Sequence, residues 1–153
     1  IACLGCRDEL EVHFTRRYFS VIRKTKSIGV DLVSQSNSVI IGDMLNLPFS
    51  DAEHQVVIAS HSLEHVSDLN LALAEIKRVL TVDGFTGIEV PCGWSGKLVA
   101  KNNIVSTGND VDLWDFGSVE AVCRLIEEAG LRVLAHQEDK SAKRCRIVAT
   151  KTA

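Results

Sequence analysis

The sequence predicts a single α/β domain with one doubly wound, mostly parallel sheet of seven strands that ends in an antiparallel hairpin. Short apolar segments alternate with segments of helical periodicity along most of the 153 residues. This alternation is typical of right-handed β–α–β units, which place neighbouring strands parallel. The last two apolar segments are separated only by the polar stretch 137–144, which is typical of a hairpin. The length suits one domain with a substantial core.

The strands are expected at short apolar segments. In chain order these are residues 1–4, 28–32, 38–41, 56–60, 86–90, 131–136 and 145–150. The first helix is expected between residues 9 and 24, because apolar residues recur there at helical spacing. Acidic residues in its first turn and basic residues in its last suit the helix dipole.

Two further helices carry terminal signals. Ser67 or Asp68 is expected to cap a helix that ends near 83–84. Its inward face comprises Leu69, Leu73, Ile76 and Leu80. Ser118 is expected to cap a helix that ends at Gly130, with Val122, Leu125 and Ile126 on its inward face.

The segment 91–115 is rich in glycine and asparagine and is too long for a simple connection. We expect it to be irregular and to form part of a site or to be mobile. It contains Trp94 and Trp114. Core packing is the usual role of a tryptophan, and covering an acceptor site is the alternative.

Composition narrows the classes of partner. The net charge of −3 and the pI of about 5.9 disfavour a nucleic-acid-binding surface. No apolar run has the length of a membrane span, and no signal segment opens the chain. Five cysteines, mostly within apolar segments, favour buried reduced thiols. We therefore expect a cytoplasmic protein.

The unusual polar residues stand where expected strands end. Asp31 and Asp43 follow two of them, and Ser60 and His61 follow a third. In an open α/β sheet, ligands bind beyond the carboxyl ends of the strands. This edge is therefore the predicted binding site.

Several spaced motifs are distributed over nearly the whole chain. The first motif is Gly-Asp-Met-Leu-Asn-Leu-Pro-Phe at residues 42–49, and Leu-Glu-His-Val follows at 63–66. Glu-Ile-Lys-Arg-Val-Leu at 75–80 with Gly84, and Glu-Glu-Ala-Gly-Leu at 127–131, complete the pattern. Together these motifs resemble one family, the class I S-adenosylmethionine-dependent methyltransferases of the type 11-like group. The resemblance implies a Rossmann-like fold, S-adenosylmethionine as cofactor and, as partner, a small-molecule acceptor.

The resemblance also implies residue roles. Asp31, with Leu32 beside it, would receive the ribose hydroxyls, because a carboxylate accepts from two adjacent donors. Asp43 would accept from the adenine amino group, with Met44 packed beside the ring. Two further sets complete the expected site: Ser60 and His61 at the sulfonium end, and His65 near the acceptor as the candidate catalytic residue.

The first loop departs from the family pattern of three glycines. Gly5 and Cys6 match, whereas Arg7 and Glu9 stand where the other two glycines occur. Only glycine permits close backbone approach and positive φ without strain, so the pocket is altered or partly filled. Alternatively, Arg7 and Glu9 clamp the cofactor's carboxylate and ammonium. A third possibility is a solvated pair that caps the helix.

Other interpretations of the chain stay open. The sequence starts on its first expected strand, without the cover helices that usually precede it in the family, so we expect either a trimmed chain or a small variant with an open site. A catalytically inactive binding or interaction module is the alternative to an enzyme. His61, Glu64 and His65 match a zinc-hydrolase pattern, but a loop position and the lack of a third ligand disfavour zinc. The Cys-x-x-Cys at residues 3–6 lacks the context of a redox motif, so structural thiols are expected.

Overall fold

The computed structural model describes residues 1–153 except 7, 9, 11, 14–25, 93–98 and 108–109. The main sheet has seven strands in the order β3-β2-β1-β4-β5-β9-β8. Strands β1 (Ala2–Leu4), β2 (Ile28–Asp31), β3 (Val39–Ile41), β4 (His54–Ser60) and β5 (Leu80–Pro91) pair in parallel. The predicted α/β class is confirmed.

The C-terminal hairpin joins the sheet through its second strand. Strand β9 (Arg144–Thr150) lies between β5 and β8 (Arg132–Asp139) and runs antiparallel to both. It is therefore the one antiparallel strand of the main sheet as described, as the hairpin pattern predicted. The two hairpin strands are longer than expected, because half of the polar stretch 137–144 (137–139 and 144) pairs instead of forming a loop.

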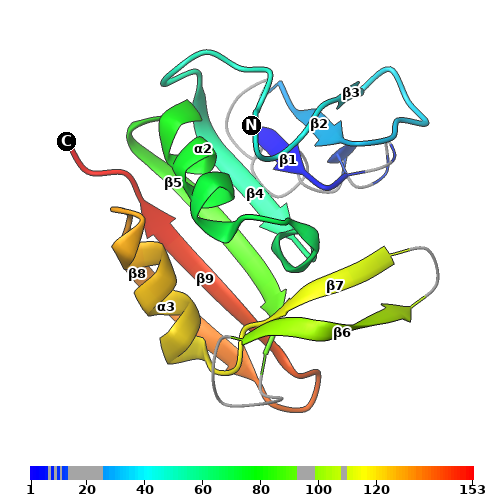
Figure 1. Cartoon of the computed structure of the whole chain (residues 1–153). Coiled ribbons are helices and arrows are strands. Elements are labelled where there is room, and N and C mark those ends of the chain that lie inside the picture. The colour runs from blue at the N-terminus through cyan, green and yellow to red at the C-terminus, as the bar shows by residue number, and fades with distance from the viewer. Residues whose placement is uncertain (7, 9, 11, 14–25, 93–98, 108–109) are drawn as a thin grey trace.

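Two helices cover one face of the sheet (Figure 1). Helix α2 (Leu69–Val79) begins at Asp68, whose side chain accepts a hydrogen bond from the Leu71 N–H, so Asp68 and not Ser67 is the cap. Helix α3 (Val119–Glu128) is capped by Ser118, as predicted. Leu80 lies outside α2 and opens β5, which corrects the expected end of that helix.

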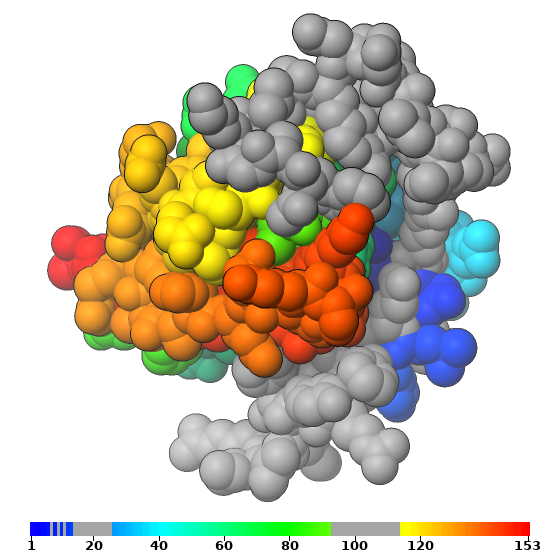
Figure 2. All heavy atoms as spheres, turned by 90° about the horizontal axis from the view of Figure 1, so that it is seen from below, coloured from blue at the N-terminus to red at the C-terminus, as the bar shows by residue number. Residues whose placement is uncertain are grey.

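The core lies between this face of the sheet and the two helices. The fully buried Leu73 and Ile76 come from α2, and Ile126 comes from α3. Burying one such side chain stabilises the fold by about 1.5–3 kcal/mol. In the view from below, α3, β8 and β9 form much of the visible described surface (Figure 2).

The expectation of an irregular segment at 91–115 was wrong. Strands β6 (Val99–Thr107) and β7 (Asp110–Asp115) form a separate antiparallel sheet that projects beside the main one (Figure 1). These strands form because two segments of the chain pair with each other. The glycine and asparagine content of a segment does not indicate such pairing. Trp94 lies outside the described residues.

The expectation of reduced thiols was also wrong. All five cysteines are described, and four of them form the disulfides Cys3–Cys6 and Cys92–Cys145, which leaves Cys123 free. The second disulfide links the end of β5 to the start of β9. Spacing could not reveal this pair, because its members are 53 residues apart and meet only through the order of the strands.

Most of the helix expected at residues 9–24 lies outside the described residues, although Leu10, Val12 and His13 are helical. Between β2 and β3, residues 32–38 connect two parallel neighbours with turns alone. This short connection leaves Leu32 and Ile41 exposed at that end of the sheet, 71% and 70% accessible. No helix in the described part of the chain is long and apolar enough to cross a membrane.

Candidate functional site

A cavity of about 530 Å³ opens at the carboxyl edge of the parallel strands. The sheet order brings the ends of β1, β2, β3 and β4 together here. The predicted site residues that line the cavity are Gly5, Asp31, Leu32, Asp43, Met44, Ser60, His61 and His65. The edge predicted from the sequence is therefore the edge at which the structure is hollowed.

Two other predicted site residues are not in the cavity wall as described. Cys6 is buried, 5% exposed, in a small cluster with Cys3, Val12 and Val39. Arg7 lies outside the described residues, as does Glu9, so none of the three possibilities for that loop is tested.

Gly5 turns the chain at the end of β1. Its φ is +73°, and its N–H donates to the Val30 carbonyl oxygen at 2.8 Å. A Cβ at this position would lie 2.5 Å from the Cβ of Ser62. The family pattern's surviving glycine is therefore required both by its backbone conformation and by this close approach.

Asp31 is the last residue of β2, and Asp43 lies two residues after the end of β3. Asp31 Oδ1 accepts from the Val33 N–H at 3.0 Å, and Asp43 Oδ1 accepts from the Leu45 N–H at 2.8 Å. Each carboxylate thus shapes its own turn with one oxygen. Since a carboxylate has two oxygens and about four acceptor positions, each retains the capacity to accept from a ligand.

The loop after Asp43 is fastened to helix α2. Arg78 donates to the carbonyl oxygens of Phe49 (2.8 Å) and Leu47 (3.1 Å), and also to Glu75. Glu75 in turn accepts from the Leu47 N–H at 2.8 Å. The hydrogen bond from Arg78 is the main cause that holds the pKa of Glu75 below its usual value. The motif residues of α2 therefore position one wall of the cavity.

His61 follows β4 and stands between two carboxylates. Its Nδ1 lies 3.3 Å from Glu64 Oε1, and its Nε2 lies 3.0 Å from Glu89 Oε1. The hydrogen bond with Glu64 is the largest cause that raises the pKa of His61, and the Glu89 charge acts in the same direction. Both ring nitrogens of His61 face carboxylates, whereas a zinc-hydrolase pattern needs His61 and His65 to bind the metal together.

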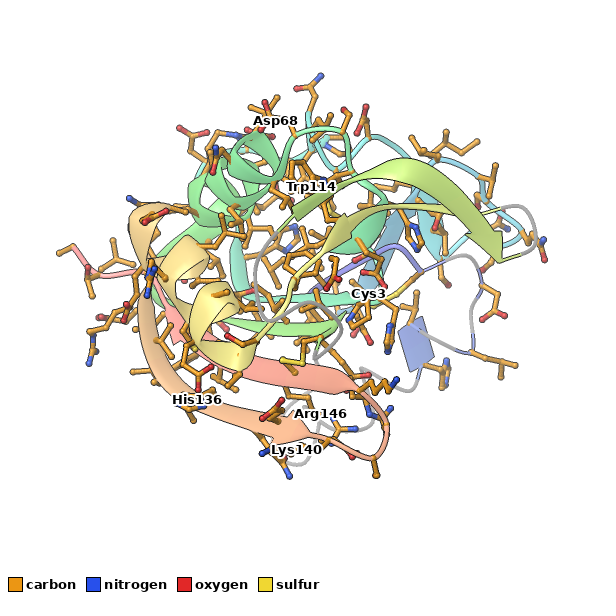
Figure 3. All side chains as sticks on the ribbon, turned by 60° about the horizontal axis from the view of Figure 1, so that its bottom comes forward. Cys3, Asp68, Trp114, His136, Lys140 and Arg146 are labelled. Atoms are coloured by element: carbon orange, nitrogen blue, oxygen red, sulfur yellow. A yellow bond between two sulfur atoms is a disulfide. The ribbon has the colours of Figure 1, made fainter. Side chains whose placement is uncertain are left out.

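The small sheet approaches the cavity through Trp114 on β7 (Figure 3). The indole N–H of this half-buried side chain donates to the Val66 carbonyl oxygen at 2.6 Å. Val66 lines the cavity directly after the 3-10 helix η1 (Leu63–His65), which also carries His65. One wall of the cavity is thus tied to the β6–β7 hairpin.

Some residues of the site were not identified as such from the sequence. Ser62 lines the cavity, and its buried Oγ finds no hydrogen-bond partner among the described residues. The pairing of His61 with Glu89 depends on β4 and β5 being neighbours, so local sequence carries no signal for it. Glu64 carried a signal, since it stands in the Leu-Glu-His-Val motif.

Comparison with protein families gives a match over residues 15–88 to the family described as methyltransferase domain. A demethylmenaquinone methyltransferase from Thermobifida fusca (strain YX) is 38% identical over 80 residues. That match covers 46% of this chain and 34% of the relative, so it spans about a third of the relative's length.

Solved structures share the fold at low sequence identity. A 1,6-didemethyltoxoflavin-N1-methyltransferase from Burkholderia thailandensis has a TM-score of 0.74 at 18% identity, over 99% of this chain and 71% of that one. A geranyl diphosphate C-methyltransferase from Streptomyces coelicolor A3(2) has a TM-score of 0.71 at 14% identity, over 99% and 70%. A [4+2]-cyclase, SpnF, has 0.74 at 15% identity, over 99% and 75%. Because the fold also occurs in a protein named as a cyclase, it does not by itself define the reaction.

Proposed function

We propose that the chain is a member of the class I S-adenosylmethionine-dependent methyltransferase superfamily, and that it binds S-adenosylmethionine in the cavity and transfers the methyl group to a small-molecule acceptor. The observation that carries the proposal is the convergence of Gly5, Asp31 and Asp43 on one cavity from three neighbouring strands. A turn that admits only glycine and two carboxylates at strand ends suit a nucleoside with an amino-acid tail.

The residues present fit this cofactor. The Gly5 turn leaves space beside Ser62 that a side chain would fill, and the unpartnered Ser62 Oγ offers a polar contact there. We assign the ribose hydroxyls to Asp31, with Leu32 beside them, and the adenine to Asp43 and Met44. The methionine end then lies toward Gly5, Ser60 and His61.

The bound cofactor supplies an activated methyl group on a sulfonium. The protein's own contribution is to hold the two reactants in line and to exclude water. His65 also lines the cavity, and we assign it the proton that an acceptor heteroatom releases.

The acceptor side is assigned to the wall that Val66 and Trp114 form with the small sheet. The hydrogen bond between them places an aromatic side chain at this wall. Named small-molecule methyltransferases among the structural relatives support an acceptor of this class. Their acceptors differ, so they do not select one for this chain.

Calorimetric titration with S-adenosylmethionine and S-adenosylhomocysteine tests the proposal. We expect both ligands to bind at one site, and adenosine to bind more weakly because it lacks the methionine end. A following screen with a cofactor labelled at the methyl group would detect transfer to candidate acceptors. Binding without transfer to any acceptor would favour the inactive binding module, and no binding of either ligand would contradict the proposal.

A further inference from the structure

His61 adopts a backbone conformation that is uncommon for a residue with a side chain. Its φ is +49°, in the left-handed region. Strain of this kind persists only where surrounding contacts hold it. His61 N donates to the Glu89 carbonyl oxygen at 2.9 Å, and its ring contacts the Glu89 and Glu64 carboxylates. The turn after β4 is therefore held by β5 on one side and η1 on the other.

The two ring contacts require a proton. A neutral imidazole carries one N–H, so it can donate to only one of two carboxylates, whereas an imidazolium donates to both. Glu64 is buried, with a side chain 4% exposed. Breaking its contact with His61 would leave a buried carboxylate oxygen without a donor, which is costly.

Other charged groups surround this arrangement. Arg146 and Arg144 on β9 also pair with Glu89, and His65 shares η1 with Glu64. Glu89 therefore keeps cationic partners when His61 is neutral, whereas Glu64 contacts His61 itself through Oε1. The Glu64 contact is consequently the part of the arrangement that depends most on the His61 proton.

The turn matters because it forms a wall of the cavity. Ser60, His61 and Ser62 all line it, and Ser62 packs against the Gly5 turn on the opposite side. A shift of the His61 turn would therefore change the space between Ser62 and Gly5. This is the part of the cavity assigned above to the methionine end of the cofactor.

We propose that His61, as an imidazolium held between Glu64 and Glu89, is a positioning residue that holds this wall in place, so that cofactor binding weakens when His61 loses its proton. The inference deepens the proposed function and rests on it. Since Glu64 and Glu89 raise the pKa of His61, its proton is retained to higher pH than on an ordinary histidine and is lost on further alkalinisation. The affinity for the cofactor should thus be highest at a pH below the raised pKa of His61 and should fall above it.

The test is calorimetric titration of S-adenosylhomocysteine across about pH 6 to 9, the range in which a histidine with a raised pKa titrates. This ligand has no sulfonium charge, so the titration reports the wall and not repulsion of a cation. We expect wild-type affinity to fall about tenfold across the range, as for the loss of one charge-assisted hydrogen bond. His61→Asn, which tolerates positive φ but does not titrate, should bind more weakly with a flat profile.

Three further variants separate this role from other causes. Glu64→Gln removes the carboxylate charge, so the fall in affinity should move to lower pH. His65→Asn removes the other cavity histidine, and whatever its effect on the affinity itself, the fall in affinity with rising pH should persist. His136→Asn, at an exposed position on β8, is the matched control and should also behave as wild type.

The proposal is overturned if His61→Asn keeps the pH-dependent fall, if His65→Asn abolishes it, or if only S-adenosylmethionine shows it. Amide hydrogen exchange of the ligand-free protein separates this failure from failure of the proposed function. If no ligand binds but the His61 amide loses protection when the His61 ring loses its proton, the positioning role of His61 stands and the cofactor assignment is wrong. If the protection of this amide is independent of pH, the positioning role itself is wrong.

Discussion

Gly5 and Ser62 face each other so closely that a Cβ on Gly5 would lie 2.5 Å from the Ser62 Cβ. The two residues belong to turns that follow neighbouring parallel strands, β1 and β4. Gly5 also has a φ of +73°, which a side chain disfavours. The width of the cavity at this point is thus set by the absence of a single methyl group.

Gly5→Ala should therefore weaken binding of S-adenosylhomocysteine by about tenfold or more, because the two turns must separate and the backbone must leave its left-handed conformation. Gly130→Ala is the matched control. Gly130 has a similar φ of +80°, but a Cβ there would meet only the flexible end of Lys77. Calorimetry and thermal unfolding should show that both variants lose stability and that only Gly5→Ala loses affinity. Equal affinity in the two variants would contradict a cofactor at this turn.

Asp31→Asn and Asp43→Asn should each weaken nucleoside binding without loss of the fold. Asparagine can still accept the hydrogen bond from the turn, so the change removes mainly the charge offered to the ligand. Losing a hydrogen bond to a charged acceptor costs about 1.5–3 kcal/mol of binding, or about 10- to 150-fold in affinity.

Asp139→Asn is a matched control for both carboxylates. Asp139 accepts from the Ala142 N–H in the β8–β9 turn, so it plays a similar local role away from the cavity. Calorimetric titration of the three variants should show reduced ligand affinity in Asp31→Asn and Asp43→Asn but not in Asp139→Asn. Unchanged affinity in Asp31→Asn or Asp43→Asn would remove the ribose or the adenine assignment.

A count of reactive thiols tests the disulfides directly. The structure predicts one reactive thiol, Cys123, when the protein is unfolded without reductant, whereas the sequence analysis expected five reduced cysteines. Reduction should lower the free energy of unfolding, because a crosslink stabilises a fold by about 2–4 kcal/mol. Cys92→Ser with Cys145→Ser should reproduce the larger part of this loss, since that disulfide closes the longer loop. Five reactive thiols without reductant would contradict the structure.

The parallel sheet was predictable because apolar segments and helix caps are local signals. Asp68 and Ser118 cap their helices through their own side chains, so sequence alone points to them. Strands β6 and β7 were missed for the opposite reason. Their pairing joins backbone segments within a stretch whose composition indicates a loop. Contacts that depend on strand order, such as that between Cys92 and Cys145, carry no local signal.

The same distinction between local signals and contacts that depend on packing applies to the residues of the site. Residues at strand ends, such as Asp31, Asp43 and Ser60, could be placed at one edge because parallel strands end together. The contact of Ser62 with Gly5 could not be predicted, since it depends on how two turns pack. The contact between His61 and Glu89 likewise requires the register of β4 against β5.

Glu75 and Arg78 should make the stability of the protein depend on acid pH. The hydrogen bond from Arg78 lowers the pKa of Glu75 in the folded state, so folding favours the ionised carboxylate. This contribution is fully present above the unfolded value of about 4.3 and is lost as the pH falls through the lower folded value. Glu75→Gln should therefore be less stable than wild type at neutral pH, and the difference should shrink in acid.

Urea unfolding at neutral and at acid pH measures this difference, with Glu128→Gln on the exposed end of α3 as the control. Arg78→Lys should lower the free energy of unfolding by about 1–3 kcal/mol at neutral pH. A lysine ammonium cannot donate at once to Glu75 and to the carbonyl oxygens of Leu47 and Phe49, as the guanidinium does. Because these contacts fasten the loop after Asp43, Arg78→Lys should also weaken ligand binding, whereas Glu128→Gln should not. A gap between wild type and Glu75→Gln that stays constant with pH would show that the Glu75 carboxylate is not the group that titrates.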